Sequence, residues 1–186
     1  MKNRARSRFA LKFLVILRGP QCSGKTEVSE KLKERLDEIK YKNVTFLLKL
    51  DEINNERFEY FLNEALKKKY YYIVGELNYG NSHTTDPIIT WLHSFKDKDY
   101  QIVSIVLGAR KEMRLQRCKK DPKRNPNDKI DEMFFNHDSE RFDRLQQDGI
   151  FQEKTGIYEI TLNTENKPPS QVADEILCHF GLKDIS

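Results

Sequence analysis

The sequence predicts an α/β fold of three layers (α/β/α), in which helices cover both faces of a five-stranded parallel sheet. Three observations support this prediction. Strand-like apolar runs alternate with helix-like segments along the chain, which is the order that produces parallel sheets. Several of the runs are continuously apolar, as in strands that are buried on both faces. A glycine-containing segment, GPQCSGKT (19–26), joins the first run to the first helix-like segment.

The expected strands are short apolar runs rich in β-branched and aromatic residues. In chain order they are FLVIL (13–17), VTFLLKL (44–50), YYYIVGEL (70–77), IVSIVLG (102–108) and IYEITL (157–162). Ligands of parallel α/β sheets bind beyond the carboxyl ends of the strands. The residues that follow each run are therefore the first candidates for a functional site.

The expected helices carry apolar residues at intervals of three and four positions. They cover 25–40, 58–66, 88–95, a segment that begins at 130, and 172–180. Pro87 precedes the third helix, where proline fits the first turn. Ser170 is expected to open the last helix and Gly181 to end it, because these residue types favour those positions.

The length of 186 residues suggests a single domain. We expect a basic, flexible N-terminal arm at 1–11 and one domain at 12–186. No run reaches the roughly 20 apolar residues that a membrane span needs, and the N-terminus lacks the apolar centre of a secretory signal. With 38% hydrophobic and 33% charged residues, the composition is typical of a soluble globular protein.

The cysteines indicate the redox environment in which the protein is expected to work, and the net charge indicates its expected partners. Cys22, Cys118 and Cys178 show neither a paired nor a zinc-like spacing, which predicts a reducing, cytoplasmic location. The net charge of +4 equals the number of basic residues before residue 9, so the rest of the chain is balanced. We expect the arm to be a solvated tail, with a contact to nucleic acid as the alternative.

The segment 19–26 matches the P-loop pattern Gly-x4-Gly-Lys-Thr, and it lies between a strand and a helix, as that motif requires. Its glycines let backbone N–H groups approach phosphates, and the next helix adds its positive end. We expect Lys25 to reach the β- and γ-phosphates and Thr26 to bind Mg²⁺, while Cys22 serves as a small side chain. The nucleotide-binding candidates are Gly19, Gln21, Cys22, Ser23, Gly24, Lys25, Thr26 and Glu27. The motif predicts a P-loop NTPase fold.

Acidic residues follow the second and third expected strands. Asp51 is the candidate catalytic base, because a carboxylate there can accept the proton of an attacking hydroxyl; capping of the next helix is the alternative. Glu76 is the candidate metal ligand together with Thr26, or a second candidate base. Asn78 and His83 are candidates for substrate contact, or they only fill the loop.

The segment at about 110–129 contains nine Lys or Arg residues and three acidic residues. At the carboxyl end of a strand, such a segment predicts a basic helical lid over a triphosphate, with a solvated face as the alternative. Arginine donors suit the charge that spreads over phosphate oxygens during transfer. Arg117 and Arg124 are therefore catalytic candidates, Arg114 is a nucleotide-binding candidate, and Arg110 is a candidate for stacking on the base.

These residues resemble the small P-loop kinases, in particular the group that holds polynucleotide kinases, chloramphenicol phosphotransferases and zeta-toxin-like kinases. The likeness rests on GPQCSGKT, on Asp51, on RLQRCKKDPKRN (114–125) and on YEITLNTENKPPSQVADEIL (158–177). It implies that Asp51 acts on the acceptor hydroxyl and that lid arginines bind the donor phosphates. Two positions depart from the group: Gly75 separates Glu76 from the apolar run, and Arg57 is too far behind Asp51 to match the substrate-binding arginine of polynucleotide kinases.

The expected activity is Mg²⁺-dependent transfer of the γ-phosphoryl group from ATP or GTP to a hydroxyl acceptor, either a small molecule or a polynucleotide 5′-hydroxyl. Two alternatives stay open. One is a nucleoside or nucleotide kinase of the same fold. The other is a non-catalytic, nucleotide-dependent module that binds RNA through the basic arm and lid.

Overall fold

The computed structural model describes residues 12–38, 44–49, 55–68, 72–78, 86–121, 131–147 and 149–182. Its strands are β1 (Lys12–Gly19), β2 (Val44–Lys49), β3 (Tyr72–Asn78), β4 (Tyr100–Gly108) and β5 (Glu159–Asn163). They form one sheet in the order β2-β3-β1-β4-β5, and every neighbouring pair is parallel. The predicted five-stranded parallel sheet is confirmed.

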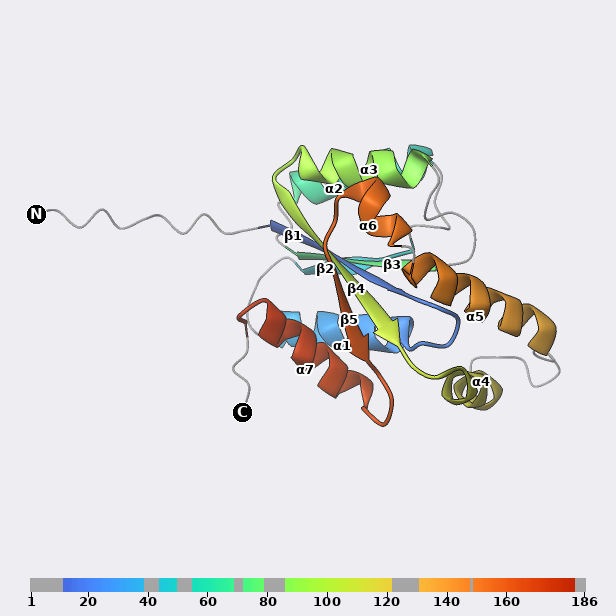
Figure 1. Ribbon diagram of the computed structural model, residues 1–186. Coiled ribbons are helices and arrows are strands. Elements are labelled where there is room, and N and C mark those ends of the chain that lie inside the picture. Colours follow the sequence, from blue (N-terminus) through green and yellow to red (C-terminus); the bar gives the residue numbers. More distant parts are fainter. Residues whose placement is uncertain are drawn as a thin grey trace, which may run out of the picture.

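Helices lie on both faces of this sheet, as predicted. They are α1 (Lys25–Glu38), α2 (Asn55–Lys67), α3 (Asp86–Lys96), α4 (Lys111–Lys120), α5 (Glu132–Gln147), α6 (Ile150–Thr155) and α7 (Pro169–His179). Figure 1 shows α2, α3 and α6 over one face and α1 and α7 over the other. In the same view, α4 and α5 lie toward the end of the sheet at which β4 ends.

The central strand β1 explains why the sequence shows a continuous apolar run. Leu14 and Ile16 join the core under α2, α3 and α6, whereas Val15 and Leu17 join the core under α1 and α7. All four side chains are almost completely buried. A strand covered on both faces favours apolar residues at successive positions, so residues 14–17 show no alternation.

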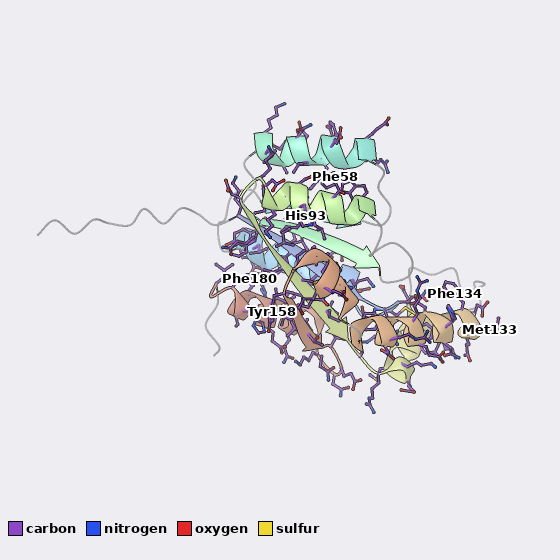
Figure 2. The ribbon with its side chains drawn as sticks, turned by 45° about the horizontal axis from the view of Figure 1, so that its top comes forward. Phe58, His93, Met133, Phe134, Tyr158 and Phe180 are labelled. Atoms are coloured by element: carbon purple, nitrogen blue, oxygen red, sulfur yellow. A yellow bond between two sulfur atoms is a disulfide. The ribbon has the colours of Figure 1, made fainter. Side chains whose placement is uncertain are left out.

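The two cores differ in composition. The core under α2 and α3 is rich in aromatic residues, among them Phe58 of α2 (Figure 2). The ring of Phe58 stacks on Trp91 of α3, with centroids 4.8 Å apart. The core under α1 and α7 is mainly aliphatic. Figure 2 also shows Met133 and Phe134 on α5, where both side chains are exposed to solvent.

The last helix ends as predicted but begins differently. Gly181 has a left-handed φ of +64°, and its N–H donates to the carbonyl oxygen of Cys178 at 2.9 Å, which terminates α7. Pro168, not Ser170, occupies the N-cap position, and Pro169 is the first helical residue. The prediction for Ser170 is wrong because the fixed φ of proline already suits the first turn. The short helix α6 escaped prediction since six residues show no clear periodicity.

The sheet brings several loops to one edge. Parallel pairing aligns Gly19 at the end of β1 with Asn78 at the end of β3, and Gly108 at the end of β4 with Asn163 at the end of β5. The ends of β3, β1, β4 and β5 therefore lie side by side. In the described ranges, no helix combines the length and the apolar character that crossing a membrane requires.

Candidate functional site

The loop between β1 and α1 has a backbone that only glycine can adopt at two positions. Gly19 has a φ of +149°, and a Cβ atom there would lie 2.7 Å from the carbonyl oxygen of Leu107 and 2.6 Å from Oγ of Ser23. Gly24 has a φ of +94°. Between them, Cys22 also lies in the left-handed region, at +58°. The loop therefore folds tightly around its own backbone before α1 begins at Lys25.

The side chain of Lys25 folds back over this loop. Its residue is 7% exposed, and Nζ donates to the carbonyl oxygens of Gly19 at 2.9 Å and Pro20 at 3.1 Å. These bonds satisfy a buried ammonium group with backbone acceptors. An anion with stronger acceptor oxygens, such as a phosphate, can replace those carbonyls without exposing a new charge.

Next to Lys25, three oxygen-bearing side chains form a compact cluster. Thr26 Oγ1 donates to Oε2 of Glu76 at 3.1 Å, and Ser29 Oγ donates to Oε1 of the same carboxylate at 2.7 Å. Glu76 is 4% exposed and Ser29 is completely buried. Gly75 separates Glu76 from the apolar run of β3, but the carboxylate of Glu76 still reaches Thr26.

This cluster fits a magnesium ion in its chemistry. Mg²⁺ prefers oxygen ligands and is commonly held by one or two carboxylates together with substrate phosphates and water. Glu76 supplies one carboxylate and Thr26 one hydroxyl at the start of α1. Among the described residues, no group of three or more His, Cys, Asp or Glu side chains could hold a metal alone.

A cavity of about 440 Å³ opens beside the loop. Its lining comes from the loop and the start of α1, from α4, and from the segment that joins β5 to α7: Cys22, Ser23, Gly24, Glu27, Val28, Met113, Gln116, Arg117, Lys120, Asp121, Thr164, Lys167, Pro169 and Val172. The size is in the range of small-molecule sites. Apolar side chains from α1 and α7 and cationic side chains from α4 thus share one concave surface.

Arg117 faces this cavity and is held by the β5–α7 segment. Its guanidinium donates to Oγ1 of Thr164 at 3.0 Å and to the carbonyl oxygen of the same residue at 2.6 Å. Thr164 Oγ1 in turn lies within hydrogen-bond distance of the carbonyl oxygens of Ser23 and Gly108. One threonine therefore connects Arg117, the P-loop and the end of β4.

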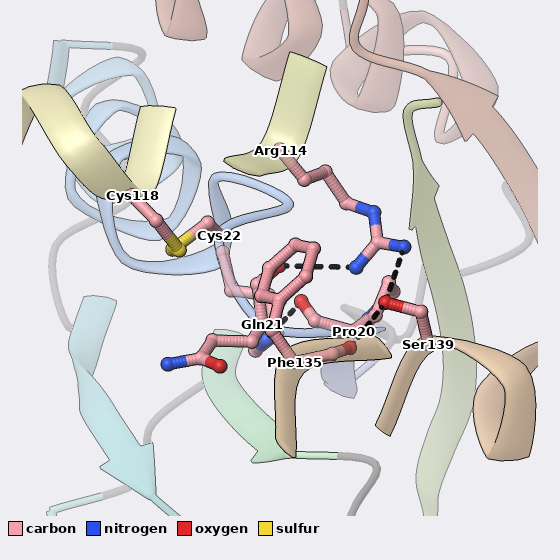
Figure 3. Close-up of a disulfide and its surroundings, with 8 residues drawn as sticks. Pro20, Gln21, Cys22, Arg114, Cys118, Phe135 and Ser139 are labelled. Carbon is pink, nitrogen blue, oxygen red and sulfur yellow. Dashed lines mark hydrogen bonds between the residues drawn. A yellow bond between two sulfur atoms is a disulfide. The ribbon is translucent and has the colours of Figure 1, made fainter. Parts of the chain in front are cut away.

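Arg114, one turn earlier on α4, lies beneath the loop. It is 2% exposed, and it donates to the carbonyl oxygen of Gln21 at 3.3 Å and to Oγ of Ser139 at 2.9 Å (Figure 3). It also donates to the carbonyl oxygen of Ala109 at 3.1 Å. Burial lowers the pKa of Arg114, and nearby carboxylates oppose that shift. Through its hydrogen bonds to Gln21 and Ser139, Arg114 joins α4 to the P-loop and to α5.

The P-loop is also joined to α4 by a disulfide bond between Cys22 and Cys118, whose Cα atoms are 5.7 Å apart (Figure 3). The spacing of the cysteines gave no sign of this pair, and the prediction that Cys22 serves only as a small side chain is wrong. Ninety-six positions separate the two residues, so no short-range spacing rule could detect the pair. The third cysteine, Cys178, is free.

Arg110 occupies the N-cap position of α4 and pairs with Glu165. Its Nε donates to both carboxylate oxygens at 3.0 and 3.1 Å. The backbone N–H and the guanidinium of Arg110 lower the pKa of Glu165. The expected stacking of Arg110 on a base stays a prediction, and the side chain here points to the β5–α7 segment.

One known protein family matches most of this chain. A family model described as "AAA domain" matches residues 15–143, from β1 through α5. The chain belongs to the AAA domain family. No curated protein matches it in sequence.

Solved structures share the fold of this AAA domain at low identity. Shikimate kinase from Acinetobacter baumannii, in complex with shikimate, is 18% identical with a TM-score of 0.53, over 96% of this chain and 98% of that one. The tunicamycin resistance protein of Deinococcus radiodurans is 15% identical with a TM-score of 0.56, over 92% and 97%. Deoxyadenosine kinase from M. mycoides, with bound dATP, is 13% identical with a TM-score of 0.54, over 92% and 100%. The predicted α/β P-loop fold is confirmed, and the narrower likeness to polynucleotide kinases and their relatives stays a prediction.

The described part of the AAA domain brings together most of the predicted site. Lys25, Thr26 and Glu76 are adjacent, and Cys22, Ser23, Gly24, Glu27 and Arg117 line one cavity. Asp51, His83 and Arg124 lie outside the described residues. The roles assigned to all of these residues stay predictions.

Sequence reasoning missed three polar residues of this chain. Ser29, Ser139 and Thr164 make the hydrogen bonds described above to Glu76, Arg114 and Arg117. Only Ser29 had a signal: it is a hydroxyl one turn after Thr26, between the apolar positions 28 and 32 of α1. The other two come from distant elements.

Proposed function

We propose that this protein is a Mg²⁺-dependent phosphotransferase that moves the γ-phosphoryl group of ATP or GTP to a hydroxyl acceptor. The observation that carries the proposal is the arrangement of Lys25 over the P-loop, beside the Thr26–Glu76 pair and a cavity of about 440 Å³. An ammonium group, a metal-binding oxygen pair and a concave surface are the parts that phosphoryl transfer from a nucleotide needs.

The donor nucleotide would use both the loop and the cavity. Its phosphates would accept hydrogen bonds from the backbone N–H groups of the P-loop at the positive end of α1. Its base and ribose would occupy the cavity between Arg117 and the apolar side chains of Val28 and Val172. Lys25 would exchange its bonds to two loop carbonyls for bonds to phosphate oxygens.

Glu76 and Thr26 would hold the metal, and a bound Mg²⁺ supplies charge neutralisation at the phosphate oxygens. The acceptor hydroxyl would form a bond to the γ-phosphorus while the bond to the bridging β–γ oxygen breaks, leaving a nucleoside diphosphate. Lys25, Arg117 and Arg124 would stabilise the charge on the transferring group. Asp51, which follows β2 by two positions, would take the proton of the hydroxyl.

A small-molecule acceptor is favoured over a polynucleotide. Two structural neighbours are kinases named for the small molecules shikimate and deoxyadenosine. The sequence lacks an arginine close behind Asp51. A nucleoside or nucleotide kinase is the second candidate, supported by the deoxyadenosine kinase fold, and a polynucleotide 5′-hydroxyl is the third.

The deciding experiment measures acceptor-dependent release of ADP or GDP. Labelled ATP and GTP are each incubated with Mg²⁺ and panels of hydroxylated metabolites, nucleosides, nucleotides and 5′-hydroxyl oligonucleotides. We expect label to move to members of one panel. Nucleotide binding without transfer to any panel would contradict the proposal and favour a non-catalytic module, whose RNA affinity would fall steeply with salt and with deletion of residues 1–8.

Asp51→Asn then tests the base. We expect the variant to keep nucleotide affinity within about twofold and to lose transfer by roughly 10²-fold or more. Asp37→Asn, which changes an exposed carboxylate of α1, is the matched control and should match the wild type. Unchanged transfer in Asp51→Asn would move the base role to Glu76.

A further inference from the structure

The Cys22–Cys118 disulfide is placed where it can affect ligand binding. Cys22 belongs to the P-loop and lines the cavity, while Cys118 is a buried residue of α4. α4 also contributes Arg117 to the cavity. The bond therefore joins the floor of the proposed nucleotide site to one of its walls, as Figure 3 shows for the loop and the helix.

Cys22 also has an unfavourable backbone conformation. Cys22 has a φ of +58°, in a region that residues with a Cβ atom rarely adopt. Such a conformation persists only where surrounding contacts impose it. On this side of the loop, the described contacts include the disulfide and the hydrogen bond from Arg114 to the carbonyl oxygen of Gln21, which at 3.3 Å is long.

We propose that Cys22–Cys118 is a reversible thiol–disulfide site that sets nucleotide affinity: the oxidised protein binds tightly and the reduced protein weakly. This inference rests on the nucleotide binding of the proposed function and adds a redox control to it. In the oxidised form the loop and α4 are already ordered for the ligand, whereas the reduced form must order them during binding. We expect the dissociation constant of the reduced form to be about three- to tenfold higher.

The reaction is an exchange with a dithiol. A thiolate of the dithiol attacks Sγ of Cys22, which lies at the cavity, so a mixed disulfide forms and Cys118 leaves as a thiolate that takes up a proton. The second thiol of the reagent then closes its own disulfide and releases Cys22. The protein gains two electrons and two protons, and the dithiol becomes a cyclic disulfide.

The experiment compares the two redox forms of the full chain. The protein is oxidised with oxidised glutathione or reduced with dithiothreitol, and alkylation followed by mass spectrometry counts the free thiols. We expect one free thiol, Cys178, after oxidation and three after reduction. Calorimetry with the Mg²⁺ complex of a non-hydrolysable ATP analogue then gives each dissociation constant, and reoxidation should restore the tighter one.

Two variants make the result specific. Cys118→Ala should bind with the affinity of the reduced wild type under both conditions. Cys178→Ser should keep the full redox response, because this free cysteine lies on α7. A redox response that persists in Cys118→Ala, or one that is lost in Cys178→Ser, would overturn the inference.

Linkage supplies a second, independent measurement. If oxidation tightens nucleotide binding, saturating nucleotide must shift the thiol–disulfide equilibrium toward the disulfide by the same factor. Equal affinities in both forms, or an equilibrium that nucleotide does not shift, would overturn the inference but leave the proposed function intact. If neither form binds nucleotide, the proposed function fails and the redox control falls with it.

Discussion

The two halves of the P-loop are attached to the protein by different chemistry. The first half is joined to α4 by the disulfide of Cys22 and by the hydrogen bond from Arg114 to the carbonyl oxygen of Gln21. The second half continues into α1 and meets β3 through the hydroxyl of Thr26 and the carboxylate of Glu76. The first half is therefore held by a covalent bond and by a hydrogen bond to the backbone. The second half is held by a hydrogen bond between two side chains, whose oxygen atoms can also bind other partners.

Because of this difference, we expect the first half to position the loop and the second half to take part in the reaction. A disulfide and a backbone carbonyl bonded to arginine hold the loop in place, but they offer little to a phosphate or a metal. A hydroxyl and a carboxylate can exchange their mutual hydrogen bond for bonds to Mg²⁺. We therefore expect changes in the second half to affect turnover, and changes in the first half to affect stability and affinity.

The largest effect is expected for Lys25→Ala. Removal of the ammonium group takes away a cation that we propose binds the β- and γ-phosphates, so transfer should fall by at least roughly 10²–10³-fold. Lys31→Ala, which changes an exposed lysine of the same helix, is the matched control. Labelled phosphate transfer measures both variants, and near wild-type transfer by a folded Lys25→Ala protein would refute the role given to the second half.

Glu76→Gln should have the next largest effect. The substitution keeps the size of the side chain and one of the two acceptor oxygens that the hydroxyls of Thr26 and Ser29 use, but it removes the negative charge. We expect transfer to fall on the order of 10²-fold and the Mg²⁺ concentration for half-maximal activity to rise. Glu59→Gln, on the exposed face of α2, is the control. A normal Mg²⁺ requirement in Glu76→Gln would show that this carboxylate does not hold the metal.

The same contrast explains what the sequence could predict. The Gly-Lys-Thr half is a local motif, and its backbone conformation and the helix that follows it depend on neighbouring residues, so it could be predicted. The layered fold could be predicted as well, because apolar runs and helix-like segments alternate along the chain. The attachment of the other half depends on residues about a hundred positions away. Cys118 and Arg114 lie near the loop because β4, which precedes α4, pairs with β1, and no local sequence pattern indicates that contact.

Arg114 and Arg117 test the contrast within a single helix. Arg114→Ala should lower the free energy of unfolding by about 2–4 kcal/mol, because it leaves a buried space and removes the donor to Gln21 and Ser139. Arg117→Ala should cost less than about 1 kcal/mol and weaken nucleotide binding roughly tenfold, because the side chain lines the cavity. Denaturant unfolding and calorimetry measure the two quantities. A reversed ranking would mean that Arg114 binds the nucleotide and Arg117 supports the fold.

The smallest effect concerns the start of α4, where Arg110 lowers the pKa of Glu165. A carboxyl group with a lowered pKa in the folded state contributes stability above its unfolded value, near 4.5, and this contribution disappears as the pH falls through the folded value. Between pH 7 and pH 3, wild-type protein should therefore lose slightly more stability than Glu165→Gln. Denaturant midpoints at both pH values measure the difference, and Glu153→Gln on α6 is the exposed control. Equal losses in wild type and Glu165→Gln would mean that this pair does not help to hold the start of α4 to the β5–α7 segment.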